Sequence, residues 1–178
     1  MHHMKGKITD FKAGFVSILG KPNVGKSTLI NALVGERLSI ITSKAQTTRH
    51  RIFGILSTSD SQIIFSYTTG VIDPQYKLQD RMMRFVKASL EDADLILYMV
   101  ELGEKFDNNK NFQHIFKNQA PKFLIINKTD QAKGSQIIDK VDYWQELFPT
   151  VQIFPISALK KLNIDELYQA IKLVLPYH

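Results

Sequence analysis

Apolar positions along this chain alternate between short continuous runs and longer stripes with helical spacing. The runs predict strands over residues 14–19, 51–58, 62–66, 94–100, 122–126 and 151–156. The stripes predict helices over residues 28–34, 78–89, 109–118, 137–148 and 164–175, with Asn163 and Glu166 forming a capping box at the start of the last one. Only Ser59 and Asp60 join the second and third strands, and so short a link favours an antiparallel pair. The pattern therefore predicts an α/β fold with about six strands, mostly parallel, one antiparallel strand, and helices on both faces.

The link between the first predicted strand and the first predicted helix carries a phosphate-binding motif. Residues 20–27 read Gly-Lys-Pro-Asn-Val-Gly-Lys-Ser and fit the pattern Gly-x4-Gly-Lys-Ser/Thr in the strand-to-helix context that the motif requires. Backbone N–H groups of such a loop cradle a triphosphate, Lys26 adds a cation, and the Ser27 hydroxyl is placed to ligate Mg²⁺. The predicted phosphate-binding residues are Gly20, Asn23, Val24, Gly25, Lys26, Ser27 and Thr28.

A second motif follows the predicted strand 122–126 and selects the base. The carboxylate of Asp130 can accept both N–H groups on the edge of guanine, whereas adenine would leave that carboxylate unpaired at a cost of ~1–3 kcal/mol for each unsatisfied group. The methylenes of Lys128 can lie along the base plane. Backbone N–H groups of the segment 157–159 can reach the guanine oxygen. The predicted base-binding residues are Asn127, Lys128, Asp130, Ser157, Ala158 and Leu159.

These motifs carry a family resemblance. The run 20–27 together with Lys-Ala-Gln-Thr-Thr-Arg-His-Arg over residues 44–51 resembles the bacterial Era family of GTPases, and the resemblance covers residues ~13–175. It implies a P-loop small G domain that binds GTP and GDP with Mg²⁺, hydrolyses GTP slowly in the cytoplasm, and acts in maturation of the small ribosomal subunit through 16S rRNA. Era proteins also carry a C-terminal KH-type RNA-binding domain. We therefore expect this chain to be the GTPase domain alone, over residues 13–178, with residues 1–12 a tag and N-terminal extension.

The resemblance also implies switch residues. The segment 39–51 is polar without helical spacing, and we interpret it as a candidate switch loop. Within it Thr48, or Thr47 if the register is shifted by one, would join Ser27 as a Mg²⁺ ligand and contact the γ-phosphate. The N–H of Gly70 would also reach that phosphate. Lys26, Thr48 and Gly70 are the implied catalytic set, while Arg49 and Arg51 either contact RNA or are simply solvated.

The sequence departs from the family at one position of the metal site. The family has Asp-Thr-Pro-Gly after the third strand, and this chain has Tyr-Thr-Thr-Gly at residues 67–70. The missing carboxylate would help to hold Mg²⁺, and the neutral phenol of Tyr67 is a poor partner for a hard cation. An alternative hypothesis is therefore a GTP- and GDP-binding module whose hydrolysis is impaired by Tyr67.

Composition limits the remaining function classes. The chain has no cysteine and no apolar run long enough for a membrane span, which leaves only peripheral membrane contact open. The net charge of +6 is uneven, since residues 1–90 hold 13 Lys and Arg against 5 Asp and Glu. This basic half either serves phosphates and an anionic partner such as RNA or is an ordinary solvated surface.

Overall fold

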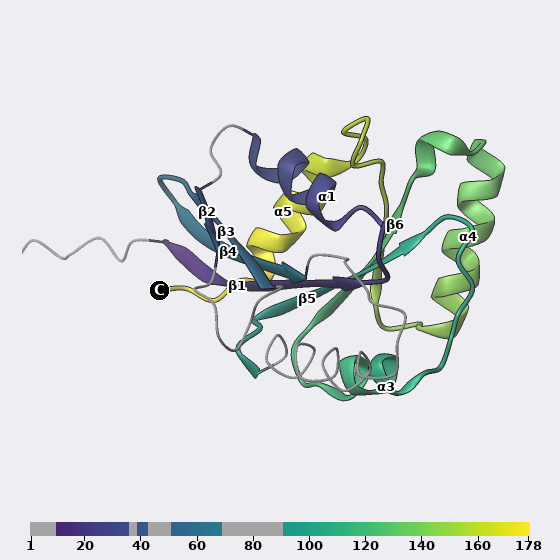
Figure 1. The fold of residues 1–178 in the computed structure, drawn as a ribbon, viewed down its shortest axis with the longest axis horizontal. Coiled ribbons are helices and arrows are strands. Elements are labelled where there is room, and N and C mark those ends of the chain that lie inside the picture. The colour runs from purple at the N-terminus through teal and green to yellow at the C-terminus, as the bar shows by residue number, and fades with distance from the viewer. Residues whose placement is uncertain (1–9, 36–38, 43–50, 69–90) are drawn as a thin grey trace, which may run out of the picture.

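The computed structural model describes residues 10–35, 39–42, 51–68 and 91–178. Within these residues seven strands form a single sheet in the order β2-β3-β4-β1-β5-β6-β7 (Figure 1). The strands are β1 (Lys12–Gly20), β2 (Ser39–Thr42), β3 (Arg51–Ser57), β4 (Ser61–Thr68), β5 (Leu95–Glu101), β6 (Lys122–Asn127) and β7 (Gln152–Pro155). The helices are α1 (Lys26–Val34), α3 (Lys110–Lys117), α4 (Gly134–Leu147) and α5 (Ile164–Val174), with a 3-10 turn at Thr129–Gln131.

The sheet confirms the predicted fold class and adds one strand to it. Strand β1 pairs in parallel with β4 and β5, and β6 pairs in parallel with β5 and β7. Strand β3 is antiparallel to both β4 and β2, so it alone runs against the others in this sheet. The count of about six strands was too low, because Ser39–Thr42 forms the edge strand β2 and is not part of a loop. Its two isoleucines are β-branched and favour an extended backbone.

Side chains alternate along the central strands and thereby build a core on each face of the sheet. Leu95, Leu97 and Met99 of β5 face one core, which also contains residues of α1 and α5. Ile96 and Val100 point the opposite way and pack in the clusters that include residues of α3 and α4. The helices accordingly cover both faces, as Figure 1 shows. Because parallel strands end at the same edge, the loops after β1, β5, β6 and β7 all emerge there.

The helix ends agree with the sequence in one case and differ in another. Asn109 caps α3, since its Oδ1 accepts a hydrogen bond from the backbone N–H of Phe112 at 2.8 Å. The capping box predicted at Asn163 is wrong. Asn163 does precede α5, but its backbone is left-handed with φ 61°, and its side-chain amide donates to the carbonyl oxygen of Pro155 at 3.0 Å. The local need for a left-handed residue, which asparagine tolerates, has overridden the cap.

Several predicted features lie outside the described residues. They are the helix over 78–89 and the switch residues Thr47, Thr48, Arg49 and Gly70. No helix within the described ranges is both long and apolar enough to cross a bilayer.

Candidate nucleotide-binding site

The phosphate-loop sequence forms a tight connection from β1 into α1. Gly20 is paired with Met99 of β5, and a Cβ at Gly20 would lie 2.7 Å from the Met99 carbonyl oxygen. Gly25 precedes α1 with φ 105°, a backbone conformation that side-chain-bearing residues rarely adopt. The glycines of the motif are therefore required by geometry, and the loop delivers the free N–H groups of the α1 N-terminus to the carboxyl edge of the sheet.

Lys26 is directed back into this loop. Its Nζ donates to the carbonyl oxygens of Gly20 at 2.8 Å and Lys21 at 3.2 Å. The side chain is buried, and burial lowers the pKa of the Lys26 ammonium to about 8. Ser27 and Thr28, the next two residues of α1, are exposed. Within the described residues this buried cation bonds neutral carbonyls, and its place at the N-terminus of a helix gives the chemistry of an anion-binding site.

Asn127 connects the two predicted motifs. Its side-chain Nδ2 donates to the carbonyl oxygen of Val24 at 2.8 Å, and its Oδ1 accepts from the backbone N–H of Ala158 at 3.0 Å. Asn127 is buried, with 4% of its surface exposed, so both bonds are shielded from water. A Cβ at Gly25 would lie 2.3 Å from the same Nδ2. The phosphate loop, the end of β6 and the segment after β7 are thereby locked together at the carboxyl edge of the sheet.

The predicted base-binding residues lie in the turn after β6 and in the turn after β7. Asp130 is exposed, and the hydroxyl of Ser157 donates to its Oδ1 at 2.8 Å. The backbone N–H of Lys160 in turn donates to the Ser157 hydroxyl at 3.1 Å. The N–H of Ala158, expected near the guanine oxygen, is directed at Asn127 and not at solvent. The N–H of Ser157 donates to the carbonyl oxygen of Leu162 at 3.2 Å, so the hypothesis that an N–H of the segment 157–159 contacts guanine centres on the N–H of Leu159.

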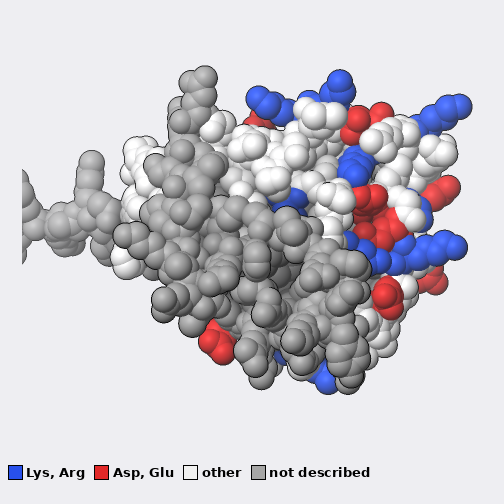
Figure 2. Space-filling model, viewed as in Figure 1, with Lys and Arg blue, Asp and Glu red and all other residues white. Residues whose placement is uncertain are grey.

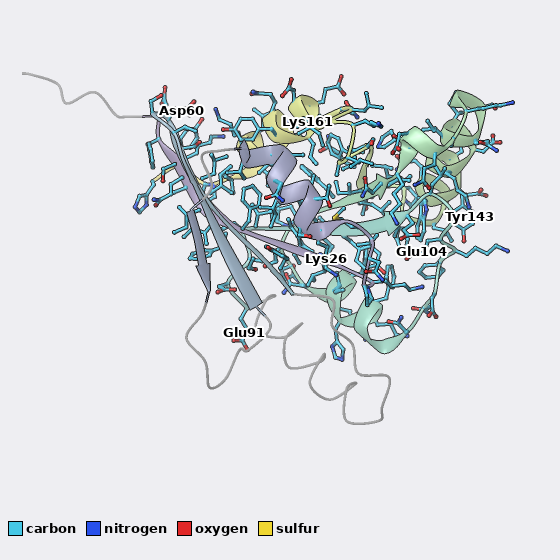
Figure 3. All side chains as sticks on the ribbon, turned by 45° about the horizontal axis from the view of Figure 1, so that its top comes forward. Lys26, Asp60, Glu91, Glu104, Tyr143 and Lys161 are labelled. Atoms are coloured by element: carbon cyan, nitrogen blue, oxygen red, sulfur yellow. The ribbon has the colours of Figure 1, made fainter. Side chains whose placement is uncertain are left out.

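Two glutamates that the sequence reasoning missed contact lysines of the site. Glu101, the last residue of β5, accepts a bond from Lys128 Nζ at 2.6 Å. Glu104 lies 3.9 Å from Nζ of Lys21 in the phosphate loop, and burial raises the pKa of the Glu104 carboxyl. Figure 3 shows Lys26 at the start of α1 and Glu104 in the segment that follows β5. The available signal was the position of Glu101 at the carboxyl end of a buried parallel strand, where ligand-site residues gather.

Tyr67 occupies the position at which the family has a carboxylate of the metal site. Tyr67 is paired with Ile18 in the β1–β4 ladder, two residues before the phosphate loop. Its side chain packs against the core on the α1 face, and burial raises the pKa of the phenol. The Tyr67 hydroxyl therefore stays neutral at physiological pH. Among the residues that the structure describes, no group of three or more His, Asp or Glu side chains could hold a metal ion.

Comparison with known families gives a match over most of the chain. Residues 15–128 match the family profile described as 50S ribosome-binding GTPase. A curated relative, GTPase Era of Staphylococcus haemolyticus, is 40% identical over 171 residues, which cover 95% of this chain and 57% of the relative. GTPase Era of Staphylococcus epidermidis shows the same identity and coverage. The chain thus spans a little over half the length of the curated relatives that it matches.

Comparison with solved structures also finds Era proteins. An Era variant of Aquifex aeolicus bound to GDP and AlF4⁻ superposes with a TM-score of 0.76 at 39% identity, covering 94% of this chain and 58% of that one. Era in complex with MgGDPNP and a segment of 16S ribosomal RNA gives the same values. The G domain of FeoB from Methanococcus jannaschii has a TM-score of 0.66 at 27% identity, with 92% of this chain and 98% of that one covered.

Proposed function

Because this chain belongs to the 50S ribosome-binding GTPase family, we propose that it is an Era-like G domain that binds GTP and GDP and hydrolyses GTP to GDP. The observation that carries the proposal is the Asn127 bridge between Val24 and Ala158. It joins a phosphate-binding loop to a guanine-specific turn, and neither motif alone requires such a contact. We assign residues 13–178 to this domain.

The phosphate half of the site acts through Lys26 and the start of α1. Lys26 bonds two neutral carbonyl oxygens, which are weaker partners for an ammonium than phosphate oxygens. A bound triphosphate would exchange those contacts for charge-assisted ones and would sit at the positive end of the helix. Lys26 and the loop N–H groups would then stabilise the charge that develops as water attacks the γ-phosphate.

The base half acts through Asp130. Ser157 holds one oxygen of this carboxylate, which restricts its rotation and preorganises it toward the two N–H groups of a guanine edge. Lys128 supplies an apolar stem for the face of the base. Adenine would leave the carboxylate without donors, so guanine nucleotides are the proposed substrates.

A Mg²⁺ ion fits the described residues only in part. The exposed Ser27 hydroxyl would contact it, and Thr48 is the second proposed ligand. When bound, the ion supplies positive charge to the β- and γ-phosphate oxygens. Tyr67 offers it no negative charge, since the phenol is neutral and packs against the core. This observation favours a second candidate function, a nucleotide-binding module in which GTP binds but hydrolysis is impaired.

A ribosomal partner is proposed from the relatives. The structure of Era with 16S ribosomal RNA supports an rRNA of the small subunit, whereas the family description names the 50S subunit. On the face seen in Figure 2, blue and red side chains of the described residues are interspersed around α4. The described residues on that face therefore form no one-sided basic surface for a phosphate backbone. We therefore propose 16S rRNA as the partner, with weak binding by this domain alone.

Single-turnover cleavage of GTP, with protein and Mg²⁺ in excess, tests the two candidate functions. The wild-type chain is compared with Lys26→Ala, Asp130→Asn and the double variant Tyr67→Asp/Thr69→Pro. Slow cleavage by the wild type, abolished by Lys26→Ala and not seen with ATP, supports a working GTPase. Cleavage by the double variant alone supports the binding module. If the wild type binds neither GTP nor GDP, both candidates are wrong.

A further inference from the structure

We propose that Glu101 is a positioning residue for the purine base, an inference that rests on the proposed guanine-nucleotide site. Glu101 would act through Lys128, whose ammonium it holds at the carboxyl edge of the sheet. The two residues are joined by a bond of 2.6 Å between Lys128 Nζ and Glu101 Oε1. Glu101 lies outside both sequence motifs, and its contact decides where the Lys128 side chain runs.

The strand register fixes the two ends of that side chain. Glu101 is the Cα partner of Asn127 in the β5–β6 ladder, and Lys128 is the next residue along. Neighbouring strands lie ~4.8 Å apart, a separation that the four methylenes of lysine can span. With Nζ held at β5, the stem of Lys128 crosses from the end of β6 to the end of β5. The result is a short apolar bar next to the phosphate loop, which follows β1 on the other side of β5.

The backbone at Lys128 is fixed as well as its side chain. Lys128 has a left-handed conformation with φ 69°, which is uncommon for a residue with a side chain. The N–H of Gln131 bonds the Lys128 carbonyl oxygen at 3.1 Å, and the N–H of Thr129 bonds the Ile156 carbonyl oxygen at 3.2 Å. Backbone and side chain are therefore both fixed before a base arrives. The methylenes of Lys128 then form the surface that contacts the base.

The ion pair is worth little as a stabilising contact, because the side chains of Lys128 and Glu101 remain 33% and 39% exposed. Its effect lies in preorganisation. Ordering a free lysine on binding costs ~0.5–1.5 kcal/mol, so an anchored stem favours base binding by about two- to thirteenfold. Glu101 also neutralises the ammonium, which would otherwise be free to leave the base for a phosphate oxygen.

The experiment measures binding of GDP and of inorganic tripolyphosphate to the wild-type chain and to Glu101→Ala. Tripolyphosphate has no base, so it reports the phosphate loop alone. We expect GDP to bind about two- to thirteenfold more weakly to Glu101→Ala, with tripolyphosphate unchanged. Glu146→Ala, which removes an exposed glutamate of α4, is the matched control and should alter neither affinity.

A second background tests whether the effect passes through Lys128. Lys128→Met keeps an apolar stem and removes the ammonium, so adding Glu101→Ala to it should cause no further loss of GDP affinity. Equal weakening of both ligands by Glu101→Ala, no weakening of GDP, or a full Glu101→Ala effect in the Lys128→Met background would each overturn the positioning role. A wild-type chain that binds no GDP would instead refute the proposed function itself.

Discussion

The side-chain amide of Asn127 donates to the carbonyl oxygen of Val24 at 2.8 Å, although the two residues lie 103 positions apart. The other end of the same amide accepts from Ala158. One buried side chain thus satisfies backbone groups of two loops, one proposed to bind the phosphates and the other proposed to bind the base. This arrangement makes the stability of the free domain and the geometry of its site depend on the same contacts.

Asn127→Ala should lower the free energy of unfolding by about 2–4 kcal/mol, since it leaves the Val24 carbonyl and the Ala158 N–H without their partner in a buried setting. Urea unfolding of the nucleotide-free protein measures the change. Asn108→Ala is the control, because Asn108 is exposed. A loss below about 0.5 kcal/mol, within the usual range for surface substitutions, would show that neither bond matters.

Gly25→Ala should be more damaging than Gly35→Ala. Both glycines have positive φ, 105° and 55°, so in both cases alanine suffers backbone strain of roughly 1–2 kcal/mol. At Gly25 the new Cβ would also strike a neighbour, the Asn127 amide at 2.3 Å, whereas no described residue lies within 4 Å at Gly35. Thermal unfolding and GDP affinity, measured on both variants, separate the effect of backbone strain from that of the clash with Asn127. Equal effects of the two substitutions would argue against the close packing of the phosphate loop on Asn127.

Guanine-nucleotide affinity should fall as the pH rises through about 8. Burial lowers the pKa of Lys26 to about 8 in the free protein, so above that pH the side chain is increasingly neutral. Bound phosphate favours the charged form, and binding therefore takes up a proton at high pH. Between pH 7 and 8.8 GDP affinity should drop about sixfold by this linkage. Isothermal titration measures it, and Lys26→Met should bind weakly with little slope. A flat wild-type profile would contradict the assignment.

The sequence predicted the parts of this fold whose signals are local and strong. Strands 122–126 and 94–100 are continuous apolar runs, and the glycines of residues 20–27 have spacing that only one loop geometry accommodates. Strand β2 escaped because four residues with two isoleucines give too short a pattern, and its pairing with β3 is decided by tertiary context. Asn163 was misread because a capping box and a left-handed asparagine have the same sequence signal.

The site shows the same division. Asp130, Lys26 and Asn127 could be predicted because their chemistry belongs to contiguous motifs, and the convergence of those motifs followed from a parallel sheet. The contacts of Glu101 with Lys128 and of Ser157 with Asp130 could not, since each pair is 27 positions apart and depends on side-chain direction. Sequence spacing gives the edge of the sheet at which a residue lies, but not the partner toward which its side chain turns.

Ser157→Ala should weaken GDP binding about three- to tenfold while leaving the preference for guanine over adenine in place. The hydroxyl of Ser157 holds Asp130 Oδ1 at 2.8 Å, so its loss frees a side chain that binding must then order. The carboxylate itself remains, and with it the discrimination between bases. Asp130→Asn should instead reduce the preference, because an amide cannot accept both N–H groups of guanine. Ser135→Ala, at an exposed position of α4, is the control. Competition binding with GDP and ADP distinguishes the outcomes: a loss of selectivity in Ser157→Ala would mean that the serine contacts the base directly, and unchanged selectivity in Asp130→Asn would refute the base assignment.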